Sequence, residues 1–340
     1  MIRPIPPGTR DVLPDEMREL RAIQAALLGT FEAGGFSEVR TPTLEYADAL
    51  ELGDRASAGS AYRFFDERGE LLALRTDMTI PIARLVADRF RDLEPPHRLS
   101  YLANAYRAVT PQRGELREFG QAGVELIGVP GHGGTAEVVG LLDRSLSAVG
   151  LDESVIGIGH SRLWSALLED AGASVETIAR ASRLLADHDL VGVEVALRDS
   201  GELGSGAVAE AVELSQLRGG VEVLERARDL GGRNFAAALG RLSGTFEEVS
   251  RREIGREVLL DLGMLREIGY YTGSTIEVYD AAVGDIIGGG GRYDGLMRRF
   301  GLELPAAGFT LYIERIHKAQ LERGDAASRA REGGTGGAGV

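Results

Sequence analysis

The chain has 340 residues, with 38 lysines and arginines against 52 aspartates and glutamates, and it contains no cysteine. Its length predicts about two domains with a large buried core, and the lack of cysteine excludes disulfides, thiolate metal sites and a cysteine nucleophile. The net charge of −14 disfavours broad, sequence-independent nucleic-acid binding, and no apolar stretch has the length of a membrane span or a signal core, so a cytoplasmic protein is expected.

The N-terminal half alternates between helical and extended patterns. Prolines keep residues 4–14 out of helix, and apolar residues three and four apart then predict a helix that ends at Gly34 and Gly35. Residues 62–65 and 71–74 are typical of a β-hairpin across a turn that contains Gly69. The remaining predictions are strands at 36–42, 97–107, 115–127 and 155–158, a helix at 80–90, and a helix capped by Thr135.

The C-terminal half begins with a change of character. Residues 163–253 carry Ala, Leu, Glu and Arg at helical spacing, which predicts a mainly helical insertion. Strands are expected at 257–262, 275–279 and 285–287, a helix at about 307–322, and a disordered tail at 323–340. Strands grouped as hairpins between helices indicate an α+β fold with an antiparallel sheet, in which 1–162 and 254–322 form the core.

One predicted strand carries an unusual polar pattern. Alternation places five residues of segment 117–125 on a single face, and a second set shares a face of the preceding strand. These sets are Arg117, Phe119, Gln121, Gly123 and Glu125, and Tyr101, Ala103, Ala105 and Arg107. An arginine, a glutamine and a glutamate beside a glycine suit a ligand floor, although the solvated face of an antiparallel sheet explains the periodicity equally well.

Two further segments attract attention, and neither is diagnostic alone. Tyr270 and Tyr271 follow Arg266, and four consecutive glycines at 288–291 predict that another strand or a ligand approaches the backbone closely. The glycines match neither a Walker loop nor a dinucleotide-binding pattern. The five histidines form no metal-binding pair, so surface or capping positions are expected for them, with no metal site and no cofactor.

Taken together, the segments resemble the catalytic core of histidyl-tRNA synthetases, which has the class II aminoacyl-tRNA synthetase fold. The resemblance covers about residues 4–320 in six ordered motifs. These are PGTRDVLP at 7–14, FSEVRTPTLE at 36–45, LALRTDMT at 72–79, AYRAVTPQRGELREFGQAGVE at 105–125, LREIGYYTG at 265–273, and GGGGRYDGL with AAGFTLYIER at 288–296 and 306–315.

The resemblance implies a histidine pocket and a remnant of an ATP site. Asp77 and Gln121 would hold the α-ammonium group of the amino acid, and Glu125 and Tyr271, with Tyr270 beside them, would bind the imidazole. Arg266 would contact the carboxylate, because a guanidinium matches that geometry. The arginines that would correspond to phosphate contacts are Arg107, Arg117 and Arg315, and Pro42 of the first strand motif would lie at a dimer interface.

At several positions the sequence differs from the synthetases, and there it resembles the regulatory-subunit family of ATP phosphoribosyltransferase. The members of that family are synthetase paralogues without the tRNA-binding domain. Val109 replaces a glutamate that helps to place adenine, and Tyr312 stands where a glycine faces the nucleotide. Residues 266–269 read Arg-Glu-Ile-Gly instead of Arg-Gly-Leu-Asp, and Gly273 replaces a basic residue. The sequence also ends soon after the last motif.

This second resemblance implies a regulatory subunit without catalytic activity of its own. It would act with a short-form ATP phosphoribosyltransferase catalytic subunit at the first step of L-histidine biosynthesis, as a homodimer within a hetero-oligomer. L-histidine would be the effector, and neither tRNA nor a membrane would be a partner. Two alternatives stay open: a truncated synthetase-like enzyme that adenylates histidine, and a scaffold whose pocket binds nothing.

Overall fold

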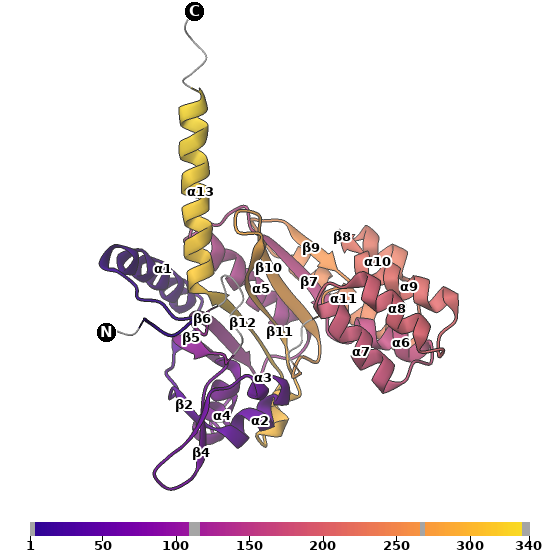
Figure 1. Cartoon of the computed structure of the whole chain (residues 1–340), viewed down its shortest axis with the longest axis horizontal. Coiled ribbons are helices and arrows are strands. Elements are labelled where there is room, and N and C mark those ends of the chain that lie inside the picture. Colours follow the sequence, from indigo (N-terminus) through magenta and orange to yellow (C-terminus); the bar gives the residue numbers. More distant parts are fainter. Residues whose placement is uncertain (1–3, 109–115, 266–268, 335–340) are drawn as a thin grey trace, which may run out of the picture.

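The structure, a computed structural model, describes residues 4–108, 116–265 and 269–334 (Figure 1). Within these ranges a nine-stranded sheet forms the centre, in the order β1-β5-β6-β12-β11-β10-β7-β9-β8. Its strands are β1 (Ser37–Glu38), β5 (His97–Tyr106), β6 (Glu118–Ile127), β7 (Val155–His160), β8 (Arg218–Gly219), β9 (Val258–Asp261), β10 (Ser274–Asp280), β11 (Asp285–Arg292) and β12 (Ala306–Tyr312).

The centre of this sheet is antiparallel, as predicted, but two pairs towards its edges are parallel. β1 pairs with β5, and β7 pairs with β9, in the parallel sense, which makes the sheet mixed. A parallel pair needs a long crossover connection. The predicted insertion lies between β7 and β9 in the chain, and it therefore supplies one of these crossovers.

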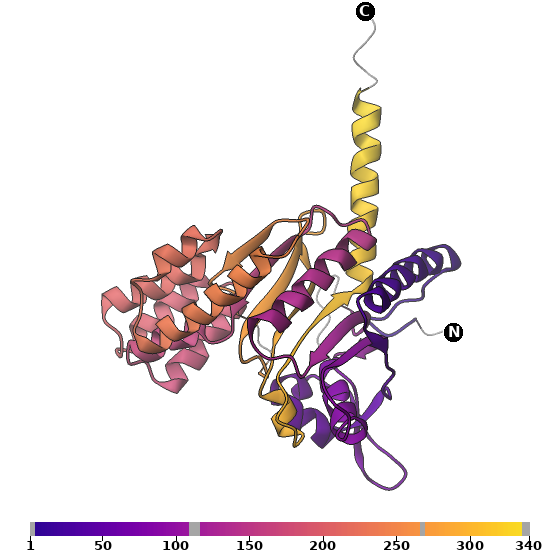
Figure 2. The same ribbon diagram turned by 180° about the vertical axis from the view of Figure 1, so that it is seen from behind.

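Different layers cover the two faces of the sheet (Figures 1 and 2). One face packs its apolar side chains, among them Val124 and Leu126, against α1 (Pro14–Ala33), α5 (Gly131–Ala148) and α13 (Ile313–Gly334). The opposite face of β5 and β6 packs under a smaller unit. That unit contains β2 (Leu44–Tyr46), β3 (Arg63–Phe65) and β4 (Leu71–Leu74), with α2 (Ala47–Gly53), α3 (Arg55–Gly59), α4 (Thr79–Arg89) and α12 (Leu296–Arg299).

The insertion gathers at the end of the sheet away from α1 (Figure 2). It contains α6 (Leu163–Asp170), α7 (Val175–Ala186), α8 (Leu190–Asp199), α9 (Ser205–Gln216), α10 (Glu222–Ala227) and α11 (Arg233–Ser250). The short strand β8 also belongs to it and pairs with β9. Because Trp164 and Phe235 belong to the same buried cluster as the sheet, the insertion shares one hydrophobic core with it.

Four predictions about elements need correction. Thr135 does not cap α5, because the helix begins at Gly131. Thr135 lies within the helix, and its side chain is buried. Residues 306–312 form strand β12 instead of the start of a helix, because they pair with β6 and β11 on both sides. β11 continues through the glycines to Arg292. α13 continues to Gly334, where a tail without structure was expected, since Ala, Glu and Arg favour helix.

Three of the five histidines, His97, His160 and His317, are buried instead of lying at the surface, whereas His132 and His188 are exposed. No helix in the described ranges combines the length and the apolar character needed to cross a bilayer.

Candidate functional site

The polar face of β6 forms a buried floor. Across the pair with β12, Glu125 lies opposite Gly308, Gly123 opposite Thr310, and Gln121 opposite Tyr312. Glu125 and Gln121 are each only 2% exposed. The alternative of a solvated sheet face is therefore wrong for these two residues, and the ligand floor stays a prediction.

Glycines give the floor its depth. A Cβ atom on Gly308 would lie 2.0 Å from Oε2 of Glu125, so only glycine lets this carboxyl group extend over β12. A Cβ on Gly290 would lie 2.1 Å from the carbonyl oxygen of Gly308. The close approach predicted for the glycine run is thus confirmed, and the neighbouring strand is what approaches it.

Two carboxyl groups dominate the electrostatics of the site. The hydroxyl of Thr79 donates to Oε1 of Glu125 at 2.7 Å, and the hydroxyl of Tyr293 donates to Oε2. Burial raises the pKa of Glu125 to about 8, more than these hydrogen bonds lower it. Desolvation likewise raises the pKa of Asp77 to about 6, opposed by the amide of Ile80, which donates to its Oδ1 at 3.1 Å.

Three tyrosines form one wall. The rings of Tyr270 and Tyr271 lie 5.1 Å apart, and that of Tyr293 lies 5.7 Å from Tyr270, both pairs in edge-to-face geometry. Tyr293 and Thr79 are additions to the predicted site. Both lie in segments that carry the resemblance, GGGGRYDGL and LALRTDMT, but only the fold shows that their hydroxyls meet Glu125.

The floor and the wall enclose a cavity of about 40 Å³. It is lined by five of the six predicted histidine contacts, namely Asp77, Gln121, Glu125, Tyr270 and Tyr271, together with Arg107. The sixth, Arg266, lies outside the described residues. Oε1 of Gln121 is buried, with no hydrogen-bond partner in the described part of the chain. An unpaired buried acceptor is costly, so this amide oxygen is available to a donor on a ligand.

The three arginines predicted to mark an ATP remnant separate in the structure. Arg107 and Arg315 line a second, larger cavity of about 700 Å³. Arg117 lines neither cavity and packs against Gly8 in the N-terminal arm, the segment 4–13 that precedes α1. In the larger cavity Arg315 is paired with Asp285 at 3.0 Å. Pro42, predicted at a dimer interface, is exposed, and its carbonyl oxygen accepts from Arg75.

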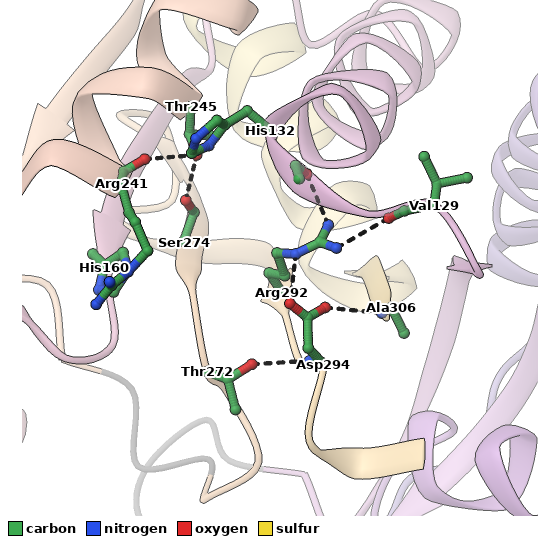
Figure 3. A network of polar contacts seen from close by, with 11 residues as sticks. Val129, His132, His160, Arg241, Thr245, Thr272, Ser274, Arg292, Asp294 and Ala306 are labelled. Carbon is green, nitrogen blue, oxygen red and sulfur yellow. Dashed lines mark hydrogen bonds and ion pairs between the residues drawn. The ribbon is translucent and has the colours of Figure 1, made fainter. Parts of the chain in front are cut away.

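A polar network involves residues that flank Tyr293 and follow Tyr271 in the chain (Figure 3). The guanidinium of Arg292 donates to Asp294 at 2.9 Å and to the carbonyl oxygens of Val129 and Gly131, both at 3.0 Å. The amide of Asp294 in turn donates to the hydroxyl of Thr272, next to Tyr271. These contacts fix the backbone on either side of Tyr293 and directly after Tyr271.

The same view shows how the insertion joins the core (Figure 3). The hydroxyl of Thr245 on α11 lies 2.9 Å from Nδ1 of His132 and 2.8 Å from the hydroxyl of Ser274 on β10. Nearby, Nε of Arg241 lies 3.4 Å from Nε2 of His160, whose pKa burial lowers to about 4. Ser274 is three residues from Tyr271, so α11 is attached close to the tyrosine wall.

Comparison with known proteins agrees with this architecture. The family model described as histidyl-tRNA synthetase matches residues 8–316. An ATP phosphoribosyltransferase regulatory subunit from Moorella thermoacetica is 41% identical over 332 residues, which is 97% of this chain and 84% of the relative. A protein of the same name from Desulforamulus reducens is 40% identical over 93% of this chain and 79% of its own.

Among solved structures, an ATP phosphoribosyltransferase regulatory subunit/histidyl-tRNA synthetase from Bacillus halodurans superposes with a TM-score of 0.85. The two sequences are 31% identical, and the superposition covers all of this chain and 92% of the Bacillus halodurans chain. The fold is therefore that of the class II histidyl-tRNA synthetases, as predicted. Identity of this extent over nearly the whole length places the chain in the family of ATP phosphoribosyltransferase regulatory subunits.

Proposed function

We propose that this regulatory subunit binds L-histidine in the buried cavity and passes that signal to a short-form ATP phosphoribosyltransferase catalytic subunit. The chain would act as a homodimer within a hetero-oligomer in the cytoplasm, at the first step of histidine biosynthesis. Family membership supports the regulatory role. The observation that carries the histidine site is the unpaired, buried Oε1 of Gln121, in a cavity that is also lined by Asp77 and Glu125, two carboxyl groups of raised pKa.

The chemistry of the lining suits an α-amino acid with an imidazole side chain. The α-ammonium group needs acceptors, which Asp77 and Gln121 offer. The imidazole carries one donor and one acceptor when neutral, and it can pair with Glu125 and the hydroxyl of Tyr271. The guanidinium of Arg107 lines the same cavity and provides donors for the carboxylate, as would Arg266.

Binding would also supply a conformational signal. The cavity of about 40 Å³ has room for a few water molecules, so we expect lining side chains to move when histidine binds. A ligand that binds one arrangement better shifts the population towards it. At 100 times its dissociation constant, histidine would stabilise the bound arrangement by about 2.7 kcal/mol, comparable with typical allosteric couplings of about 1–3 kcal/mol.

The deciding experiment measures phosphoribosyl-ATP formation by the short-form catalytic subunit, with and without this chain, over a range of histidine concentrations. We expect a large increase in activity that histidine suppresses. Glu125→Ala should keep the increase and lose the suppression, whereas Glu303→Ala, at an exposed ion pair with Arg298, should behave as the parent chain does. No increase with a folded chain would refute the regulatory role, and suppression that survives Glu125→Ala would place the sensor elsewhere.

A histidine-adenylating enzyme is the competing function, because Arg107 and Arg315 line a cavity next to the candidate histidine site. Such an enzyme must exchange pyrophosphate into ATP when histidine is present. We expect no exchange above that of Arg107→Ala, and histidine-dependent exchange that this substitution abolishes would favour the enzyme.

A further inference from the structure

The small and the large cavity meet at two shared residues, Arg107 and Tyr312. The small cavity contains the candidate histidine contacts, whereas the large one is lined mainly by charged side chains from the N-terminal arm, α1 and α13. A ligand that extended from one cavity into the other would have to pass these two side chains.

The register of β12 explains why the boundary lies at Tyr312. Its floor-facing residues are Gly308, Thr310 and Tyr312, which lie opposite Glu125, Gly123 and Gln121 in turn. The first two are small and leave space above the strand, and the third is a full aromatic ring. The ring therefore stands beside Gln121, at the end of the pocket where the α-amino-acid group is proposed to bind.

Neighbouring side chains hold this ring in place. It packs edge to face on Phe119, with 5.9 Å between ring centroids, and the guanidinium of Arg315 lies 4.9 Å from its own centroid. Arg315 is itself anchored by Asp285 and by the carbonyl oxygen of Ile286. The guanidinium of Arg107 also lies over the ring of Phe119, 5.1 Å from its centroid. The ring of Tyr312 thus belongs to a packed cluster with the side chains of Phe119, Arg107 and Arg315.

We propose that Tyr312 is a specificity-determining residue that closes the histidine pocket at its α-amino-acid end. The pocket accepts free L-histidine and rejects histidine derivatives that carry a bulky group on the carboxyl carbon. This inference rests on the proposed function and adds the reason why the site senses the free amino acid. Specificity then comes from a steric block against the longer ligand.

The test compares two probes by calorimetry on the full chain: L-histidine, and a non-hydrolysable histidyl-adenylate analogue with a sulfamate in place of the phosphate. The parent chain should bind L-histidine and bind the analogue at least about 100-fold more weakly, a discrimination that a steric clash in a closed pocket can supply. Tyr312→Ala should improve the affinity for the analogue at least about tenfold relative to the affinity of the same variant for L-histidine. Tyr312→Val, better suited to a strand, serves as a second variant, and Tyr312→Phe should keep the block.

Two results would overturn the inference while the histidine site stands. One is a parent chain that binds the analogue as tightly as L-histidine, a measurement that needs no variant. The other is a folded Tyr312→Ala or Tyr312→Val that binds L-histidine without any gain for the analogue. A parent chain that binds no L-histidine would instead refute the proposed function, and this inference with it.

Discussion

The hydroxyl of Tyr293 donates a hydrogen bond to Oε2 of Glu125, although β6 and β11, the strands that position the two residues, are not neighbours in the sheet. Glu125 lies on β6, Tyr293 directly follows β11, and β12 runs between these strands. The contact is possible because Gly308 of β12 lies opposite both Glu125 and Gly291, so that no side chain stands between them. The candidate site thus depends on one glycine and one tyrosine hydroxyl.

Replacement of that hydroxyl tests its part in the site. In Tyr293→Phe the hydrogen bond to Glu125 is lost while the ring remains, so we expect the pKa of Glu125 to rise further and the affinity for L-histidine to fall about tenfold, as for one buried hydrogen bond. Calorimetry across a pH series measures both. Tyr279→Phe, which removes a hydroxyl bonded to Glu277 outside the cavity, is the matched control. Equal affinities for both variants would contradict this role.

Glu125 should also make stability depend on pH. Its pKa in the folded chain is about 8, above the ordinary 4.5, so the folded state keeps a proton that the unfolded state releases. Its contribution to stability is full below pH 4.5, is lost as the pH rises to about 8, and then stays constant.

Over that window the free energy of unfolding should fall by up to about 1.4 kcal/mol for each pH unit through this group. Glu125→Gln removes the titration, so the parent chain should lose stability relative to this variant between roughly pH 5 and pH 8 in urea unfolding. Asp77 acts in the same sense between 3.8 and about 6 and cancels in the comparison. A difference that does not vary with pH would show that Glu125 has no raised pKa.

Gly308 should tolerate no side chain. A Cβ there would lie 2.0 Å from Oε2 of Glu125 and 2.4 Å from the carbonyl oxygen of Val124, and backbone cannot move aside easily. Gly308→Ala should therefore lower the free energy of unfolding by about 1–3 kcal/mol or more and abolish histidine binding. Gly133→Ala, where nothing lies within 4 Å of the added atom, should keep both properties. Normal binding by Gly308→Ala would mean that the floor is open.

The junction between the insertion and the sheet is sensitive to one hydroxyl. Thr245→Val leaves the buried hydroxyl of Ser274, and Nδ1 of His132, without their shared partner, so we expect a loss of about 1–3 kcal/mol in the free energy of unfolding. Ser243→Ala, on the same helix, removes only an exposed hydrogen bond to Glu247 and should change it by less than about 0.5 kcal/mol. Equal losses in the two variants would show that the network contributes nothing specific.

The sequence alone determined most of the elements and the family. Helical spacing predicted α1 and α4, turn residues predicted the hairpin of β3 and β4, and alternation placed Gln121 and Glu125 on one face. These features depend on residues close together in the chain, whose periodicity follows from the geometry of helices and strands. The ordered motifs also predicted the class II fold and the regulatory family.

The features that depend on strand pairing could not be predicted from the sequence. Alternation could not distinguish a buried floor from a solvated face, because both have the same period; the fold decides it by burying Glu125 under Thr79 of α4 and Tyr293. The sequence also predicted a helix over about 307–322, whereas residues 306–312 form β12 because they pair with a strand on each side. The contact of Tyr293 with Glu125 and the place of Tyr312 between two cavities arise from the order β6-β12-β11, which sets residues far apart in sequence side by side.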